Sequence, residues 1–169
     1  MTKQKTHKFK GGNLDQGKAD EQEIDSLMSH RYQIQPVQLA TEIDRGIDRF
    51  WTEKRTGLRY SVEYKSDRAA LKTGNAFLEI ISNDRTKKAG WIYTTTAQII
   101  VYYVPGQGLL LLSGERLKQA IADGFIKGRR IGSAKNETYY SKGALVPLEE
   151  LDEVPGLVLS KLKVEFYPS

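Results

Sequence analysis

The stretch Gly46–Lys65 reads GIDRFWTEKRTGLRYSVEYK, and it decides the expected fold. The polar run EKRTG in its middle predicts a hairpin turn between two extended segments. An antiparallel hairpin centred between Arg55 and Thr56 places Asp48 opposite Glu63. The sequence therefore predicts two carboxylates side by side, at the end of the hairpin that lies away from the turn.

Two opposed acids are an unfavourable pairing for a sheet. Directly opposed residues of antiparallel strands have Cβ atoms about 4.5–5.5 Å apart, and like charges there are destabilising. A divalent cation reverses the sign of this effect, because hard cations such as Mg²⁺ take carboxylate oxygens as ligands. Lys65 lies two residues after Glu63 and so projects from the same face of the strand. Two carboxylates and an ammonium thus converge on one point, which suits hydrolysis of a phosphodiester.

This arrangement of residues resembles a known motif. Asp48 before a hairpin, followed by Glu63-Tyr64-Lys65, is similar to the motif of the PD-(D/E)XK nuclease superfamily, the fold of many restriction endonucleases and Holliday-junction resolvases. The resemblance covers residues 20–105 and implies that Asp48 and Glu63 hold Mg²⁺ or Mn²⁺, with Lys65 as the third catalytic residue. Ile47 stands where the motif's name has proline. The function expected from the resemblance is metal-dependent cleavage of DNA.

The expected fold is a single α/β domain of restriction-endonuclease-like type, with a central mixed β-sheet flanked by helices. Residues 1–18 read as a flexible basic N-terminal arm, and residues 19–169 as one nuclease-like domain. A capping-box-like start at Asp20 predicts a helix over 20–31. The stretch 90–96 is β-prone, and 98–113 reads as a hairpin whose first strand is central, because its apolar run is continuous.

Composition sets further bounds. The chain has 169 residues, no cysteine and a formal net charge of +5, which excludes disulfides and thiolate metal sites and fits a polyanionic partner. It has no apolar run of the ~18 residues that a membrane span needs, so no membrane partner is expected and the compartment expected is the cytoplasm. Phosphate-loop, dinucleotide-binding and serine-hydrolase motifs are not found in the sequence.

Two further sets of residues are weaker candidates. The secondary site candidates are Glu23, Glu42, Asp67, Glu79 and Gln98. The predicted DNA contacts are Lys8, Lys10, Lys72, Thr73, Asn75, Lys127, Arg129 and Arg130, since basic arms and loops commonly grip phosphates. For most of these residues a structural or solvated role is an equal or better interpretation.

Alternatives from other classes stay open. The same fold can serve as a nucleic-acid-binding module without catalysis, or as an interaction protein whose Asp48–Glu63–Lys65 group is a surface charge cluster. The sequence leaves undecided whether the DNA is duplex or branched, whether RNA is the substrate instead, and whether the protein is a homodimer.

Overall fold

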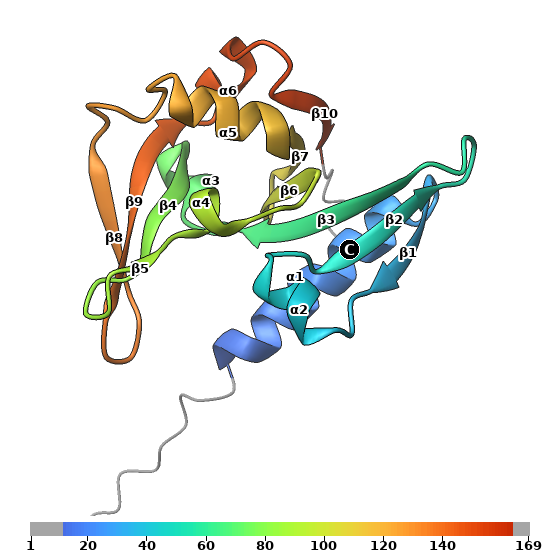
Figure 1. Cartoon of the computed structure of the whole chain (residues 1–169), viewed down its shortest axis with the longest axis horizontal. Helices are drawn as coiled ribbons and strands as arrows, with labels where there is room; N and C mark the ends of the chain where they lie inside the picture. The colour runs from blue at the N-terminus through green and yellow to red at the C-terminus, as the bar shows by residue number, and fades with distance from the viewer. Residues whose placement is uncertain (1–11, 164–169) are drawn as a thin grey trace, which may run out of the picture.

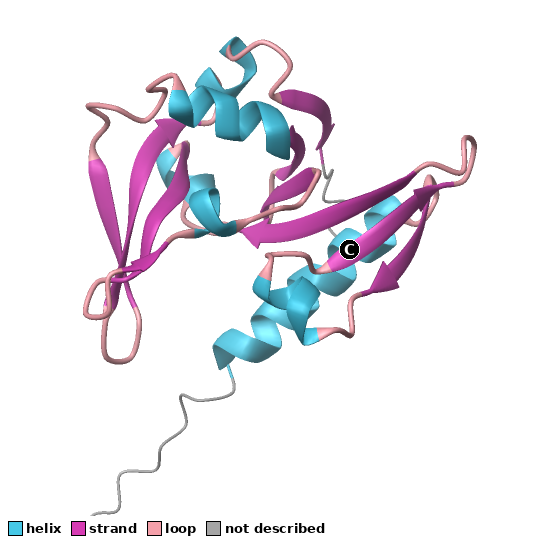
Figure 2. Ribbon diagram, viewed as in Figure 1, coloured by secondary structure: helices cyan, strands magenta, loops and turns pink. Residues whose placement is uncertain are grey.

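The fold combines helices with two β-sheets in a computed structural model that describes residues 12–163 (Figures 1 and 2). The helices are α1 (Gly12–Met28), α2 (Ala40–Asp44), α3 (Ala70–Thr73), α4 (Trp91–Thr94), α5 (Gly114–Ala122) and α6 (Glu150–Glu153). The strands are β1 (Tyr32–Pro36), β2 (Arg49–Glu53), β3 (Arg59–Ser66), β4 (Asn75–Asn83), β5 (Lys88–Ala89), β6 (Ile99–Val104), β7 (Gly108–Ser113), β8 (Ile131–Lys135), β9 (Tyr140–Pro147) and β10 (Val158–Lys163).

Six strands form a mixed sheet in the order β1-β2-β3-β6-β7-β10. Neighbours are antiparallel except β3 and β6, which run parallel. The β2–β3 hairpin pairs Arg49 with Val62, which is the predicted register. The predicted hairpin over 98–113 is also confirmed as β6 and β7, and β6 is buried along its whole length. A continuous apolar run therefore did mark a central strand.

Helix α1 covers one face of this sheet (Figure 1). Ile24 and Met28, one helical turn apart, belong to a buried cluster that includes Trp51 and Val62 of the hairpin. The helix begins at Gly12, so residues 12–18, which we expected in a flexible arm, are helical; residues 1–11 lie outside the described part. Asp20 does not cap the helix start, because its carboxylate instead binds β3 and the segment that follows it.

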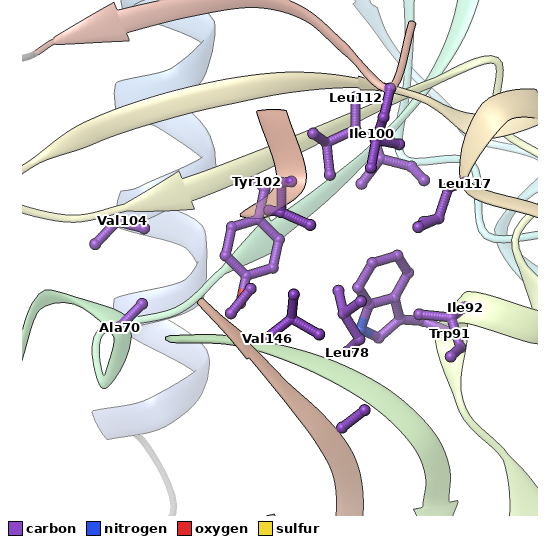
Figure 3. Packing of buried hydrophobic residues seen from close by; sticks show 14 residues of the cluster. Ala70, Leu78, Trp91, Ile92, Ile100, Tyr102, Val104, Leu112, Leu117 and Val146 are labelled. Carbon is purple, nitrogen blue, oxygen red and sulfur yellow. The ribbon is translucent and has the colours of Figure 1, made fainter. Parts of the chain in front are cut away.

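The other face of the mixed sheet packs on a second sheet that the sequence did not predict. Its four antiparallel strands have the order β5-β4-β9-β8. Leu78 and Val146 on its inner face meet Ile100 and Tyr102 of β6 in one apolar cluster, with the ring of Trp91 among them (Figure 3). The core is thus built between two sheets, with α5 closing one side through the buried Leu117.

The predicted strand over 90–96 is wrong, because this segment contains the short helix α4. Consecutive residues of a strand point to opposite faces, yet Trp91 and Ile92 are both buried in the same cluster. Burial in this core overrides the β propensity of the segment. None of the helices within residues 12–163 has the length and apolar character needed to cross a membrane.

Candidate active site at the end of the β2–β3 hairpin

Asp48 lies one residue before β2, beyond the last pair of the hairpin ladder. Its N–H donates to the carbonyl oxygen of Val62 (2.9 Å), and its carboxylate Oδ2 accepts the N–H of Tyr64 (2.7 Å). The side chain thus replaces a backbone acceptor at the point where the strand leaves the sheet. This bond holds the half-buried carboxylate in a defined position beside β3.

Glu63 and Lys65 project from the same face of β3 and form an ion pair. Lys65 Nζ lies 2.6 Å from Glu63 Oε1, and the Glu63 residue is only 4% exposed. Burial raises the pKa of Glu63, the ammonium of Lys65 opposes that change, and the nearby charge of Asp48 adds to it. The three residues that the motif predicts are therefore brought together, and the buried carboxylate is the perturbed member of the group.

The second oxygen of Glu63 has no hydrogen-bond partner. Oε2 is buried, and a Cβ on Gly46 would lie 3.1 Å from it. The hydroxyl of Thr95 lies close enough to Glu63 to lower its pKa, while its hydrogen bond goes to the carbonyl oxygen of Gly46 (3.3 Å). Gly46 has a φ of +69°, so both its conformation and its closeness to Glu63 favour glycine. Glu63 Oε2 is therefore enclosed beside Gly46 and accepts no hydrogen bond in this structure.

Two loops close over this carboxylate. Thr96 donates its N–H (2.8 Å) and its hydroxyl (3.1 Å) to the carbonyl oxygen of Arg45. These bonds fasten the segment before β2 to the segment before β6. The environment of Glu63 is therefore assembled from three parts of the chain that are distant in sequence.

Trp91 and Glu79 form the wall facing Lys65. The Nζ of Lys65 lies 5.7 Å from the centre of the Trp91 ring, within the range of a cation–π contact. Burial raises the pKa of Glu79, while Lys65, the N–H of Trp91 and Lys88 oppose that rise. Of the secondary candidates, Glu79 is the one whose charge is coupled to Lys65.

Two other secondary candidates have structural roles. Asp67 accepts hydrogen bonds from the N–H of Ala70 (3.0 Å), the N–H of Phe77 (3.2 Å) and the hydroxyl of Tyr102, so its carboxylate joins β3 to the second sheet. Gln98 Oε1 accepts the N–H of Ser61 (3.0 Å) and helps to align β3 with β6. These hydrogen bonds give both side chains a structural role that requires no ligand.

The remaining secondary candidates are Glu23 and Glu42. Glu23 lies beside Tyr103, where burial and this neighbouring carboxylate raise the pKa of the tyrosine. Tyr103 belongs to the cluster under α1, on the opposite face of the sheet from Lys65. Glu42 lies on α2, where its carboxylate is 3.7 Å from Arg45 in a loose ion pair. Neither residue forms a hydrogen bond or an ion pair with Asp48, Glu63 or Lys65.

The predicted DNA contacts fall in three places. Lys8 and Lys10 lie outside the described residues. Lys72 is exposed at the end of α3, and Thr73 and Asn75 form a turn in which Asn75 donates its N–H to the Thr73 hydroxyl (3.2 Å). This turn lines a surface cavity of about 890 Å³ that does not include the Asp48–Glu63–Lys65 group. These positions stay predictions.

The basic loop Lys127–Arg130 lies between α5 and β8. Lys127 and Arg130 are exposed, whereas Arg129 binds Glu150 (2.5 Å) and the carbonyl oxygen of Phe125 (3.2 Å). Arg129 is thus occupied by contacts within the protein. The other two remain predicted phosphate contacts.

Gly46, Thr95 and Trp91 shape the site, and the sequence reasoning assigned none of them to it. The signal for Gly46 was its place next to Ile47-Asp48, where a glycine indicates a turn or a close backbone approach. Thr95 and Trp91 carry no such local signal, because their contacts with Glu63 and Lys65 form only when β6 lies beside β3.

Within the part of the chain that the structure describes, no group of three or more His, Cys, Asp or Glu side chains is placed to hold a metal ion. The acids that the structure brings together at the end of the hairpin are Asp48 and Glu63. Comparisons of this chain with protein-family models, with curated proteins and with solved structures found no match.

Proposed function

We propose that this protein is a metal-dependent DNA endonuclease with Asp48, Glu63 and Lys65 at its active site. The observation that carries the proposal is Glu63, a carboxylate only 4% exposed whose Oε2 has no donor and which lies beside a second acid. A buried acceptor left unpaired costs about 1–3 kcal/mol, and more when it is charged. Such a group in a folded protein calls for a functional explanation.

The order of elements supports a restriction-endonuclease-like arrangement. A helix is followed by three antiparallel strands, and the strand that next joins their sheet runs parallel to the third. The restriction-endonuclease-like arrangement that the resemblance implies has the order helix, three strands, helix, strand. Here the connection from β3 to β6 contains α3, β4, β5 and α4, so part of the second sheet is built within the crossover. This insertion brings Glu79 and Trp91 to the site.

The residues present fit a hard divalent cation. Mg²⁺ keeps several waters and is commonly bound through one or two carboxylates, so a two-acid donor set is sufficient. Asp48 and Glu63 would hold the ion, because the two carboxylates lie close enough for the charge of Asp48 to raise the pKa of Glu63. An ion of this kind polarises the scissile phosphate and lowers the pKa of its bound water.

Lys65 has two roles in the proposed mechanism. Its ammonium neutralises Glu63 in the structure, with 30% of the side chain exposed. Facing a bound phosphodiester, the same group would orient the attacking water or stabilise the negative charge that develops on the phosphate in the transition state. Trp91 limits the positions of the ammonium by covering one side of it.

Metal binding and cleavage test the proposal together. Mn²⁺ binding is measured by titration calorimetry and plasmid cleavage by gel assay, for the wild type, Asp48→Asn and Glu63→Gln. Asparagine can still accept the Tyr64 N–H, so Asp48→Asn keeps that backbone bond. We expect both variants to lose Mn²⁺ binding and to lose cleavage by at least about a hundredfold.

The hairpin supplies a matched control in Glu53. This second buried glutamate of the hairpin has both oxygens hydrogen-bonded, to Arg31 and to Thr56. Glu53→Gln should leave Mn²⁺ binding and cleavage unchanged. DNA binding without Mn²⁺ binding or cleavage would favour the non-catalytic module. A wild-type protein that binds neither metal nor DNA would favour the interaction protein.

A further inference from the structure

Basic side chains gather at the tips of two adjoining hairpins of the second sheet. Arg85, Lys87 and Lys88 come from the β4–β5 turn, and Lys135 and Lys142 from the β8–β9 hairpin. We call these five residues the basic platform. The segments that carry them, 83–88 and 135–142, contain five basic residues and two acidic ones. None of the five forms an ion pair with another described residue.

The two hairpin tips are joined into one unit. Asp84 donates its N–H to the carbonyl oxygen of Tyr140 (3.0 Å), and Asp84 Oδ1 accepts the N–H of Tyr140 (3.0 Å). Figure 1 shows the β4–β5 and β8–β9 turns beside each other at the lower left of the molecule. Asp84 thus fastens the two tips together, and its charge offsets only part of the positive charge around it.

The β4–β5 tip is held in a defined conformation. Asn83 Oδ1 accepts the N–H of Arg85 (3.0 Å) and of Thr86 (3.2 Å), which forms a side-chain turn. Lys87 has a φ of +58° and is the only non-glycine residue with positive φ in the described part of the chain. An ordered tip loses less conformational entropy when it binds a ligand than a flexible one.

Strand β4 leads from the platform to the candidate active site. Glu79 precedes Asn83 by four residues, about 13 Å of extended strand. Lys65 and Lys88 both oppose the rise in the pKa of Glu79, so this carboxylate lies near a lysine of the site and near a lysine of the platform. About 13 Å is close to four base pairs of duplex at ~3.4 Å each. A nucleic acid that passes Lys65 and Glu79 would then reach the platform about four base pairs beyond Glu79.

The acids elsewhere are arranged differently. Helix α1 carries Asp20, Glu21 and Asp25, and these pair with Arg68 and Arg49. These three acids of α1 are thus paired within the fold, while Arg85, Lys87, Lys88 and Lys135 of the platform are exposed. This separation is what a phosphate-binding surface requires, because the free energy of such contacts comes largely from the release of counterions.

We propose that the basic platform is a second contact surface for the phosphodiester backbone of a nucleic acid whose scissile phosphate lies at Lys65. The proposal rests on the proposed nuclease function for the placement of the scissile phosphate. The platform itself takes no part in bond breaking. Contacts of this kind set position and register along the nucleic acid and carry no sequence information.

The test removes three charges from the platform and three from elsewhere. The platform variant is Arg85→Gln/Lys87→Asn/Lys88→Gln, with asparagine at 87 because it tolerates positive φ. The control variant is Arg55→Gln/Lys118→Gln/Lys163→Gln, which removes three exposed charges from other surfaces. Both variants have the same net charge, and circular dichroism melting checks that each is folded.

Binding is followed by fluorescence anisotropy over a range of salt concentrations, with Ca²⁺ in place of Mg²⁺. The probes are labelled DNA and RNA duplexes of one sequence. We expect the platform variant to bind at least about tenfold more weakly at low salt, and its log–log salt slope to flatten by about 0.9 for each lost phosphate contact. The control variant should match the wild type. The duplex that shows the steeper platform dependence is the ligand.

Equal losses in the two triple variants, or no loss in the platform variant, would overturn the proposal. DNA cleavage by the wild type and by the active-site variants is assayed separately, with Mg²⁺ or Mn²⁺. If the platform variant binds and cleaves DNA as well as the wild type does, the contact surface is wrong and the proposed nuclease function still stands. If the wild type binds nucleic acid through the platform but does not cleave it, the contact surface stands and the proposed nuclease function is wrong.

Discussion

Glu53 and Glu63 are buried glutamates at opposite ends of one hairpin, 6% and 4% exposed, and each lies beside a cation. Glu53 Oε1 accepts hydrogen bonds from Arg31 (3.1 and 2.9 Å), and its Oε2 accepts the Thr56 hydroxyl (2.6 Å). Glu63 has a partner only at Oε1, which forms an ion pair with Lys65, and its Oε2 has no hydrogen-bond partner. The pKa of Glu53 is lowered, first by Thr56 and then by Arg31, whereas burial raises the pKa of Glu63.

The difference separates a structural acid from a candidate functional one. Glu53 is covered by its own hydrogen-bonding partners at the rim of the sheet, so solvent and donors still favour its charged form. Glu63 is enclosed by the two loops that carry Gly46 and Thr95, and its Oε2 accepts no hydrogen bond in this structure. Burial with incomplete pairing is characteristic of sites where chemistry takes precedence over stability.

The largest effect is expected for Lys65→Met, which should lower DNA cleavage by about 10²–10⁴-fold. The same change leaves Glu63 buried without a cation, so the free energy of unfolding should also fall, by about 1–3 kcal/mol. The double variant Glu63→Gln/Lys65→Met should recover stability but not cleavage. Plasmid cleavage and urea unfolding give the two readouts. A Lys65→Met protein that cleaves at the wild-type rate would remove the lysine from the mechanism.

Metal affinity should depend on pH through Glu63. Its pKa is raised from 4.5, and a cation requires the ionised carboxylate, so Mn²⁺ affinity should increase as the pH rises through the raised pKa. The slope should approach about tenfold per pH unit below that pKa, since one proton leaves for each ion bound. Calorimetry in a series of buffers measures it, with Glu53→Gln as a control that should show the same profile. A profile that is flat from pH 4.5 to neutrality would contradict the assignment.

Two glycines of positive φ allow the packing around Glu63 to be measured. Gly46→Ala and Gly57→Ala should each cost about 1–2 kcal/mol for the left-handed conformation. A Cβ at Gly46 also lies 3.1 Å from Glu63 Oε2 and 3.1 Å from Thr95 Cα, whereas a Cβ at Gly57 has no atom within 4 Å. We therefore expect the larger loss at Gly46, together with weaker Mn²⁺ binding. Equal losses at both sites would show that the contact at Glu63 is not tight.

The smallest effects are expected for the two glutamine substitutions, and they should have opposite signs. The lowered pKa of Glu53 contributes stability above pH 4.5 that is lost as the pH falls through the lowered value, so Glu53→Gln should destabilise at neutral pH. The raised pKa of Glu63 gives a contribution that is present below pH 4.5 and lost as the pH rises through the raised value. Glu63→Gln should therefore be as stable as the wild type or more so at neutral pH, in urea unfolding at several pH values. Destabilisation by both substitutions would make Glu63 a structural acid like Glu53.

Secondary candidates show where local patterns stop being informative. Asp67 and Glu79 are both acids close in sequence to Lys65, and the sequence ranks them together. In the structure, Asp67 accepts hydrogen bonds from backbone N–H groups and from Tyr102. Glu79 instead lies near Lys65, whose charge affects its pKa. Glu79 lies on β4, which pairs with β9 from a distant part of the chain, so its place relative to Lys65 depends on contacts that are not local.

The sequence by itself determined the β2–β3 hairpin, its register and the shared face of Glu63 and Lys65. These features depend on a turn and on the two-residue period of a strand, and both are local properties of the chain. The tertiary structure alone decided the second sheet, the helix at Trp91 and the enclosure of Glu63 by Gly46 and Thr95. Those features arise where segments distant in sequence bury apolar surface against each other, and no local pattern in either segment specifies its partner.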